Sequence, residues 1–348
     1  MPIFSSTAQS LGQIMSTRRN NVLPYLVRQV LTIGYVAAGY KDGIAWRNVN
    51  SYTFSNDTAS NLGDLLQEAG NYTKGAQNKN TAYVFSTNGT GNQGVGAYTS
   101  TSCFNMRNNT SMTKNNNMNM NQTMGDGSTI QSTDLQGNYV NAYANGNMAS
   151  AIIQKFNMSS ETYSNNISTG FAQGGTGAGA HWSETFGYWW GDSADTDASY
   201  RKKFVFATDT ESTPSTAPGG HGQQKGQVAK TGYGYAGRDG GYGSNRYWRK
   251  WNYSTEVSVG DYQKAVWYCG EENYTTSQTH GIMLGAYSEA TGGNQSGTGQ
   301  TNDIGKYDYS TDSGSRLTST SLGGTATGTG SNGAAIGGRS SGVGFWRD

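Results

Sequence analysis

Large apolar residues and polar residues follow one another in a short phrase that recurs six times along the chain. Each copy has an aromatic residue, one intervening residue, a second large apolar residue and a polar run with hydroxyl, amide or carboxylate side chains. Two large residues at i and i+2 point to the same face of a strand, so each phrase predicts one half-buried strand followed by a turn. The first aromatic residues are Tyr52, Phe104, Phe156, Phe204, Trp251 and Tyr307, and the second large residues are Phe54, Met106, Met158, Phe206, Tyr253 and Tyr309.

An aliphatic or aromatic run that ends in glycine precedes most copies of the phrase. It is clearest in IGYVAAGY (33–40), FGYWWGD (186–192), TGYGYAGRDGG (231–241) and HGIMLGAY (280–287), and fainter in TAYVFST and NAYANGN. A strand that ends in glycine, a turn and an aromatic strand, repeated roughly every 50 residues, is typical of a β-propeller with four short strands per blade. The pattern therefore predicts an all-β chain and a propeller.

The C-terminal segment GAAIGGRSSGVGFWRD (333–348) resembles the start of the first repeat, with Trp346–Arg347 in the position of Trp46–Arg47. Six full phrases and half of a seventh predict six or seven blades, with seven preferred. In either case we expect strands from both chain ends to complete the last blade, because this removes an open sheet edge.

The domain organisation follows from where the repeats begin. We expect an N-terminal arm over 1–30, able to dock to another protein, and a single propeller domain over 31–348. The apolar run LPYLVRQVL (23–31) is either part of this arm or the strand that closes the last blade.

Composition favours a folded chain with many tight turns. Glycine accounts for 51 of the 348 residues and proline for 4, and charged residues are 14% of the chain against about 25% in ordinary globular proteins. The 12% of aromatic residues, with 23 Tyr and 8 Trp, argues against disorder.

Charge and hydropathy exclude several function classes. The net charge of +1 includes no basic stripe that would neutralise phosphates, so nucleic-acid binding is not expected. The sequence has no apolar run long enough for a transmembrane helix and no secretory signal pattern at its N-terminus. We therefore expect a protein that is made and kept in a cytoplasm, or that leaves it by a route other than secretion.

Two resemblances concern the repeats and the first phrase. The strand ending in glycine, followed about a dozen residues later by an aromatic strand, resembles kelch and galactose-oxidase propellers. The stretch GYVAAGYKDGIAWRNVNSYTFSNDTASNLGD (34–64) resembles a family of virion structural proteins of marine cyanobacterial myoviruses. That resemblance implies a phage particle component on the tail, neck or head surface, released by lysis, and it implies no residue-level activity.

Short motifs associated with catalysis, cofactors or metals occur in the sequence, but the structural elements or partner residues that these motifs require are missing. GYGYAG (232–237) has the spacing of a dinucleotide-binding turn but opens no predicted helix, and no histidine follows the serine of GRSSG (338–342). The three histidines, His181, His221 and His280, have no local metal-ligand spacing. We therefore predict no enzyme activity, no catalytic residues and no cofactor.

Two further groups of residues could take part in metal or redox chemistry, and each also has a simpler structural explanation. Asp192, Asp195 and Asp197 share one loop that could bind Ca²⁺, but a solvated acidic loop is the favoured interpretation. Cys103 and Cys269 lie far apart in the sequence and are expected to be two separate, partly buried thiols.

Candidate contact residues fall into two groups. Aromatic residues could stack on sugars or fill an interface, with the blade core as the alternative. The loop 107–129 has four Met residues in a polar, Asn-rich segment and is a candidate contact with another virion subunit, with disorder as the alternative. The candidate residues are Tyr188, Trp189, Trp190, Tyr247, Trp248, Met112, Met118, Met120 and Met124.

The sequence thus favours a non-enzymatic virion structural protein, a propeller displayed as an appendage or adaptor that binds other virion proteins. A carbohydrate-binding receptor adhesin that uses one propeller face is the alternative from another class, and a propeller enzyme acting on polysaccharide is the third. A glycan array would separate the second from the first.

Overall fold

The described part of the chain contains only strands, turns and irregular segments. The computed structural model describes residues 32–38, 40–41, 44–45, 47–67, 70–88, 100–113, 129–133, 139–145, 152–168, 179–191, 200–214, 228–230, 232–238, 247–263, 274–277, 279–288, 299–317 and 343–347. Within these ranges there is no helix, and so none long and apolar enough to cross a membrane. The all-β prediction is confirmed.

The described strands pair into six antiparallel sheets of four strands and one separate hairpin. The first sheet contains, in spatial order, β26 (Val343–Arg347), β1 (Ile33–Ala37), β4 (Asn48–Thr53) and β5 (Thr58–Asp64). The second contains β6 (Gly70–Gln77), β7 (Thr81–Asn88), β8 (Ser100–Asn105) and β9 (Thr110–Met112). The third contains β10 (Thr129–Thr133), β11 (Tyr139–Asn145), β12 (Ile152–Asn157) and β13 (Thr162–Ser168).

The remaining three sheets repeat the same sequential order. The fourth contains β14 (Gly179–Trp182), β15 (Phe186–Gly191), β16 (Tyr200–Val205) and β17 (Thr210–Ser212). The fifth contains β18 (Val228–Lys230), β19 (Tyr233–Arg238), β20 (Tyr247–Asn252) and β21 (Val257–Gln263). The sixth contains β22 (Tyr274–Thr276), β23 (His280–Ser288), β24 (Gly299–Asp308) and β25 (Ser313–Leu317), and the hairpin is β2 (Tyr40–Lys41) with β3 (Ile44–Ala45).

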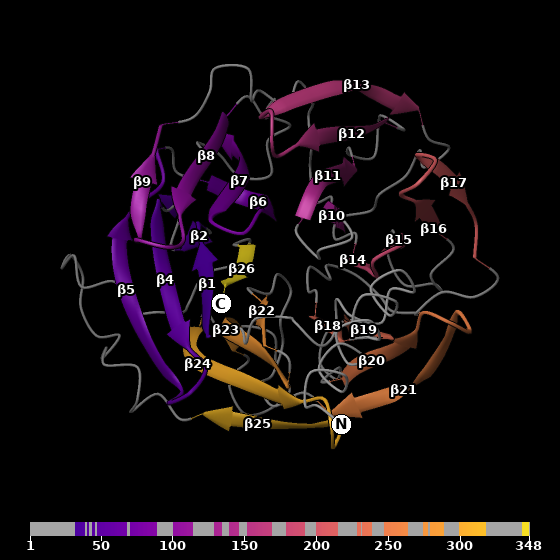
Figure 1. Cartoon of the computed structure of the whole chain (residues 1–348). Coiled ribbons are helices and arrows are strands. Elements are labelled where there is room, and N and C mark those ends of the chain that lie inside the picture. The colour runs from indigo at the N-terminus through magenta and orange to yellow at the C-terminus, as the bar shows by residue number, and fades with distance from the viewer. Residues whose placement is uncertain are drawn as a thin grey trace, which may run out of the picture.

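The sheets are arranged side by side around a common centre, with one strand of each nearest the centre and β5, β9, β13, β17, β21 and β25 at the periphery (Figure 1). Neighbouring sheets contact each other mainly through the strands near the centre. These contacts join β26 with β6, β6 with β10, β10 with β14, β14 with β18 and β19, β18 with β22, and β22 with β1 and β26. The sixth sheet is thus in contact with the first.

The C-terminal strand β26 joins the first sheet, where it pairs with β1, the first described strand of the chain. β26 runs antiparallel to β1, with Gly34 opposite Trp346 and Ala37 opposite Val343. The C-terminal half phrase therefore supplies the missing strand of the first sheet and adds no seventh sheet among the described residues. The predicted arm and the run 23–31 lie outside the described residues.

The recurring phrase is the third strand of every sheet, but that strand is shorter than predicted. The first aromatic residue lies within the strand in all six copies, whereas the second large residue is the first residue after its end. Its backbone N–H still donates to a carbonyl beside the start of the second strand, for example from Phe54 to Thr32 and from Met106 to Asn80. The second large residue therefore anchors the turn rather than the strand.

A small residue lies opposite the first aromatic residue in every sheet. The six small residues are Gly34, Ala82, Ala142, Gly187, Gly234 and Gly281. A methyl group added at Gly187 would fall far inside van der Waals contact with Ile130 of the third sheet, and one at Gly34 would overlap Thr275 of the sixth. Small residues at this position thus let neighbouring sheets approach each other closely.

Gly187→Ala is therefore expected to destabilise the protein by about 1–3 kcal/mol, because Ile130 must move within a packed interface. Chemical denaturation followed by tryptophan fluorescence measures this. The reverse change at the equivalent position, Ala142→Gly, is the control, with an expected cost of about 1 kcal/mol or less. A Gly187→Ala variant as stable as the parent would show that the two sheets do not pack this closely.

Candidate functional site

Six polar turns, one in each sheet, carry the most regular constellation of side chains in the described structure. Each turn joins the third strand to the fourth, and its last residue has a left-handed backbone with φ between 51° and 57°. This conformation is uncommon outside glycine, and Asn and Asp tolerate it best. The six residues are Asp57, Asn109, Glu161, Asp209, Glu256 and Asp312.

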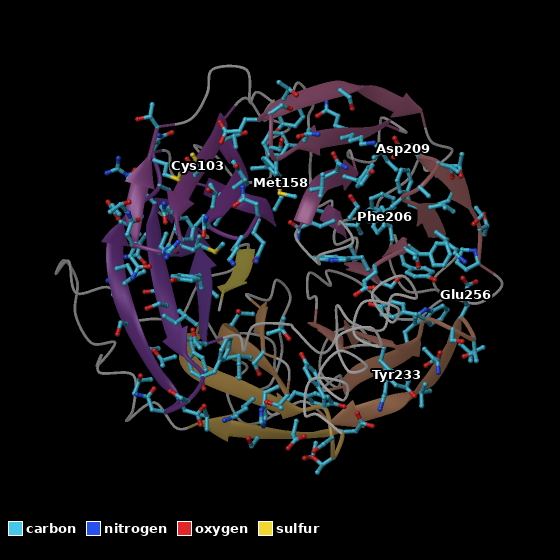
Figure 2. The ribbon with its side chains drawn as sticks, in the orientation of Figure 1. Cys103, Met158, Phe206, Asp209, Tyr233 and Glu256 are labelled. Carbon is cyan, nitrogen blue, oxygen red and sulfur yellow. The ribbon has the colours of Figure 1, made fainter. Side chains whose placement is uncertain are left out.

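The side chain of each turn residue accepts hydrogen bonds at the boundary with the preceding sheet. Asp209 of the fourth sheet accepts from the Tyr143 hydroxyl at 2.8 Å and from Lys155 Nζ at 2.6 Å, both in the third sheet. Glu256 of the fifth sheet accepts from the Tyr188 hydroxyl at 3.1 Å and from Lys203 Nζ, both in the fourth. We call such a turn residue with its donors an intersheet latch; Asp209 and Glu256 are labelled in Figure 2.

Strand register explains why the two donors of a latch act together. Tyr143 lies directly opposite Lys155, and Tyr188 lies directly opposite Lys203. Residues opposite each other in neighbouring strands project from the same face of the sheet. The tyrosine of the second strand and the lysine of the third therefore reach the next sheet from the same side.

The boundary between the first and second sheets and the boundary between the second and third have the same tyrosine contact but no lysine. The Tyr35 hydroxyl donates to the Met106 carbonyl at 2.6 Å and to Asn109 Oδ1 at 3.0 Å. The Tyr83 hydroxyl contacts the Met158 carbonyl at 3.3 Å and Glu161 Oε1 at 3.1 Å. Opposite these tyrosines the lysine is replaced by Ser51 and Cys103.

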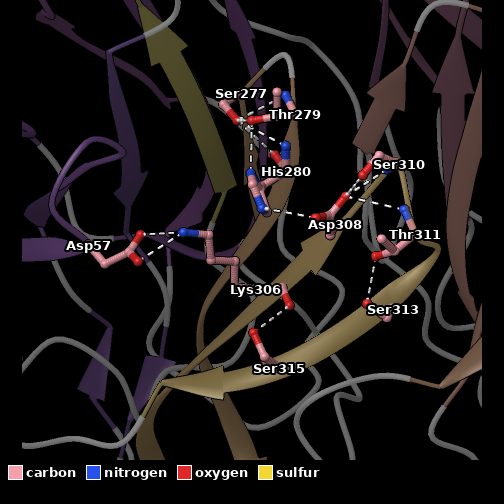
Figure 3. A network of polar contacts seen from close by, with 10 residues as sticks. All are labelled: Asp57, Ser277, Thr279, His280, Lys306, Asp308, Ser310, Thr311, Ser313 and Ser315. Carbon is pink, nitrogen blue, oxygen red and sulfur yellow. Dashed lines mark hydrogen bonds and ion pairs between the residues drawn. The ribbon is translucent and has the colours of Figure 1, made fainter.

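In the last two latches, the tyrosine belongs to the same sheet as the acceptor. Lys250 Nζ of the fifth sheet lies 2.5 Å from Asp312 Oδ2 of the sixth, and the Tyr307 hydroxyl lies 3.2 Å from Asp312 Oδ1. Lys306 Nζ of the sixth sheet lies 2.8 Å from both carboxylate oxygens of Asp57 in the first sheet (Figure 3). The Tyr52 hydroxyl completes this latch with a 2.6 Å contact to Asp57 Oδ1.

Burial and neighbouring charge set the protonation of the latch groups. Burial, followed by the adjacent carboxylate, raises the pKa of the hydroxyls of Tyr52, Tyr143 and Tyr188 far above the ordinary value, so they remain donors. Burial alone would raise the pKa of Asp57, but hydrogen bonds from Lys306 and Tyr52 outweigh it and lower the pKa. A charged carboxylate facing a cation and a phenol is the arrangement that favours adhesion between sheets.

The predicted contact residues of β15 lie in the interior of the protein. The side chains of Tyr188 and Trp189 are only 2% and 1% exposed. Tyr188 packs with Phe186 and Tyr253, and Trp189 packs in a separate cluster with Ile130. The blade-core alternative therefore describes both residues, and the structure does not present either ring to a ligand.

The other predicted site residues are only partly described. Met112 ends β9 and packs, partly buried, against a cluster that includes Cys103 and Met158. Trp190 lies in β15, and Tyr247 and Trp248 lie in β20, but their side chains are outside the description. Met118, Met120, Met124, Asp192, Asp195 and Asp197 lie outside the described residues.

The described ranges contain no candidate metal site. No three His, Cys, Asp or Glu side chains there gather closely enough to hold a metal ion. Cys103 is a buried thiol, as expected from the sequence, and its Sγ lies 3.6 Å from the Met112 carbonyl oxygen.

The latches were missed from the sequence although their signal is present there. Lysine directly precedes the first aromatic residue in the last four copies of the phrase, and the acceptor stands five residues after that aromatic in all six. The polar run was interpreted only as a turn, and nothing in one copy alone indicates that its last side chain contacts another sheet.

Comparisons with known proteins leave the latches as the main guide to function. No protein-family model matches the chain, and no curated protein matches it. The repeated latch geometry and the sequence of the first repeat are therefore the features of the chain that bear on its function.

Proposed function

We propose that the six sheets are the blades of a closed six-bladed β-propeller, and that this propeller is a non-enzymatic structural protein of a phage particle. The observation that carries the proposal is the latch between Lys306 and Asp57. It joins residues 249 positions apart through the same kind of lysine–carboxylate pair that links the third sheet to the fourth. Together with the pairing of β26 and β1, it favours a closed ring without an open edge.

The use of charge supports a structural role. Lys155, Lys203, Lys250 and Lys306 each face a carboxylate of the next sheet. A carboxylate that already accepts from a lysine and a tyrosine has fewer lone pairs left for a substrate. These four lysines and their carboxylate partners therefore act in holding neighbouring blades together.

The particle assignment rests on the first repeat. The stretch 34–64 resembles virion structural proteins of marine cyanobacterial myoviruses, and it contributes β4, β5 and most of β1 to the sheet that β26 joins. A rigid ring that places variable loops at its two ends is suited to display on a tail, neck or head surface. Its partners would be other virion proteins, reached through residues 1–30 and the loop 107–129.

A map of the intact particle with this chain traced in it tests the proposal. We expect the ring to project outward and residues 1–30 to be buried against a tail, neck or head protein. Absence of the chain from purified particles would contradict the virion assignment. In that case, binding on a glycan array would favour the carbohydrate-binding adhesin instead.

A further inference from the structure

The fourth strand of the fifth sheet carries the two large apolar side chains that are exposed among the described residues. Val257 and Val259 are 42% and 48% exposed, and they lie two positions apart in β21. β21 is the last strand of its sheet and lies at the periphery of the molecule (Figure 1). A single exposed valine is common on protein surfaces, but this pair differs from the residues that the other five sheets have at the same place.

A residue with a hydroxyl group directly follows the left-handed turn residue in the other five sheets. In the first sheet the Thr58 hydroxyl donates to Asn56 Oδ1 at 2.6 Å, and in the fourth the hydroxyls of Thr208 and Thr210 lie 2.6 Å apart. The second, third and sixth sheets have a contact of the same kind at 2.6–2.7 Å. The five hydroxyl residues, all exposed, are Thr58, Thr110, Thr162, Thr210 and Ser313.

In the fifth sheet Val257 takes the position of these hydroxyl residues. Valine has the shape of threonine with a methyl group in place of the hydroxyl, so Val257 has no hydroxyl with which to bond Thr255 in the turn. The exchange gives up a hydrogen bond and a hydrated group and adds apolar surface that faces water. It therefore does not favour the isolated chain, and it becomes favourable when another surface covers the methyl groups.

A β-bulge places the second valine on the same stretch of the outer edge. Ser258 lies opposite Trp251 and Gly260 lies opposite Lys250, so Val259 has no residue opposite it in β20. Bulges change the direction of the side chain of the extra residue, and Val259 is the most exposed large apolar residue described. We call the segment 257–259 the valine edge.

We propose that two copies of this chain associate through the valine edge, with their β21 strands antiparallel about a two-fold axis at Ser258. In this arrangement Val257 of each copy lies opposite Val259 of the other, and the four valines cover one another. A two-fold contact of this kind uses the same surface on both copies. The inference goes beyond the proposed function, since it requires neither a closed ring nor a phage particle.

Charge and register favour a second copy as the occupant of this edge. The antiparallel register places Glu256 opposite Gly260 and Asp261 opposite Thr255, so no like charges face each other. Glu256 is already paired with Lys203 of the fourth sheet, and the net charge of the chain is only +1. Natural edge strands that avoid pairing often carry lysine or proline, and β21 contains neither.

The association is expected to be weak. Two valines per copy cover far less than the roughly 1,200 Å² at which stable protein interfaces begin. The bulge also limits the length of any regular pairing between the two strands. We therefore expect a dissociation constant of about 0.1–1 mM.

Sedimentation equilibrium of the full chain, at concentrations on both sides of this constant, tests the proposal. We expect the average mass to rise with concentration toward that of a dimer. In the double variant Val257→Thr/Val259→Ser, association should weaken by at least about tenfold. Val257→Thr introduces the residue that four other sheets have here, so the variant should fold as the parent does. Thr58→Ser, at the same position of the first sheet, is the control and should leave association unchanged.

Disulfide cross-linking under a mild oxidant tests where the two copies meet. Cys103 is buried, and Cys269→Ser removes the other native thiol. In that background Ser258→Cys should give a disulfide-linked dimer, because the two-fold axis brings this position of the two copies together. Ser111→Cys is the matched control in β9, where Ser111 lies opposite Phe104 as Ser258 lies opposite Trp251, and it should remain monomeric.

Three results would each overturn the proposal. The first is an average mass of the parent that does not rise with concentration, and the second is unchanged association in the double variant. The third is equal cross-linking of Ser258→Cys and Ser111→Cys. Association that is lost in the double variant, together with cross-linking only at position 258, is the result that the proposal predicts.

Discussion

A chain that ends at Gly342 is expected not to reach the native fold. The truncation removes β26, the strand of the first sheet that contacts β6 and β22 of the neighbouring sheets. It would expose the edge of β1, where Tyr35, Val36 and Ala37 are at most 2% exposed in the native structure. The lost pairing and burial are comparable with the total stability of a typical domain, about 5–15 kcal/mol.

Circular dichroism melting and size-exclusion chromatography measure this result. We expect the truncated chain to lack a cooperative transition and to form soluble aggregates or precipitate. A chain that lacks only Asp348, one residue beyond β26, is the matched control and should behave as the parent does. Cooperative melting of the chain ending at Gly342 within a few degrees of the parent would show that β26 is not needed to complete the first sheet.

The second large effect is expected when the charge of Asp57 is removed. Asp57→Asn retains a side chain that tolerates the left-handed backbone of this turn, where φ is 53°, so backbone strain does not confuse the result. Lys306 would keep its charge, at 20% side-chain exposure, without an anionic partner in Asp57. Hydrogen bonds to charged groups contribute about 1.5–3 kcal/mol each, and partial exposure reduces this, so we expect a loss of about 1–3 kcal/mol.

The control for Asp57→Asn is an ion pair of similar length that is open to solvent. Asp64 contacts Arg47 at 3.2 Å, and both side chains are about half exposed. Asp64→Asn should change the free energy of unfolding by less than about 1 kcal/mol. Equal effects of the two substitutions in urea denaturation would contradict a special role for Asp57.

Apolar periodicity predicts the strands of this protein well because core packing requires it. The first aromatic residues, Tyr52, Phe104 and Phe156 among them, are all in third strands and are buried. The end of the phrase was predicted less well, since a large residue at i+2 can anchor a turn as readily as it can extend a strand. Periodicity alone does not distinguish these cases.

The aromatic run of β15 shows why contact residues were hard to choose from the sequence. Strict alternation would leave one of two adjacent residues exposed, yet Tyr188 and Trp189 are both buried. The two faces of this strand pack against different neighbouring sheets, with Tyr188 near Tyr253 of the fifth and Trp189 near Ile130 of the third. Only the packing of sheets against one another, which one repeat does not contain, reveals this.

The latches illustrate a different limit of sequence analysis. Lys155 and Asp209 are 54 positions apart, about one repeat, and each has an unremarkable local sequence. Their relation becomes visible only when the donor position of one repeat is compared with the acceptor position of the next. In this comparison Ser51 and Asn109 occupy the positions that hold the lysine and the carboxylate at other boundaries, and both residues are neutral.

The most direct test of a closed ring is a double-mutant cycle on Lys306 and Asp57. Lys306→Met keeps the length of the apolar stem and removes the charge, Asp57→Asn removes the partner charge, and the double variant completes the cycle. A closed ring predicts that the two effects on the free energy of unfolding are coupled by about 1–2 kcal/mol, despite the 249 positions between these residues. Effects that add to within about 0.3 kcal/mol would show that the sixth and first sheets do not meet through this pair, and would contradict the closed ring.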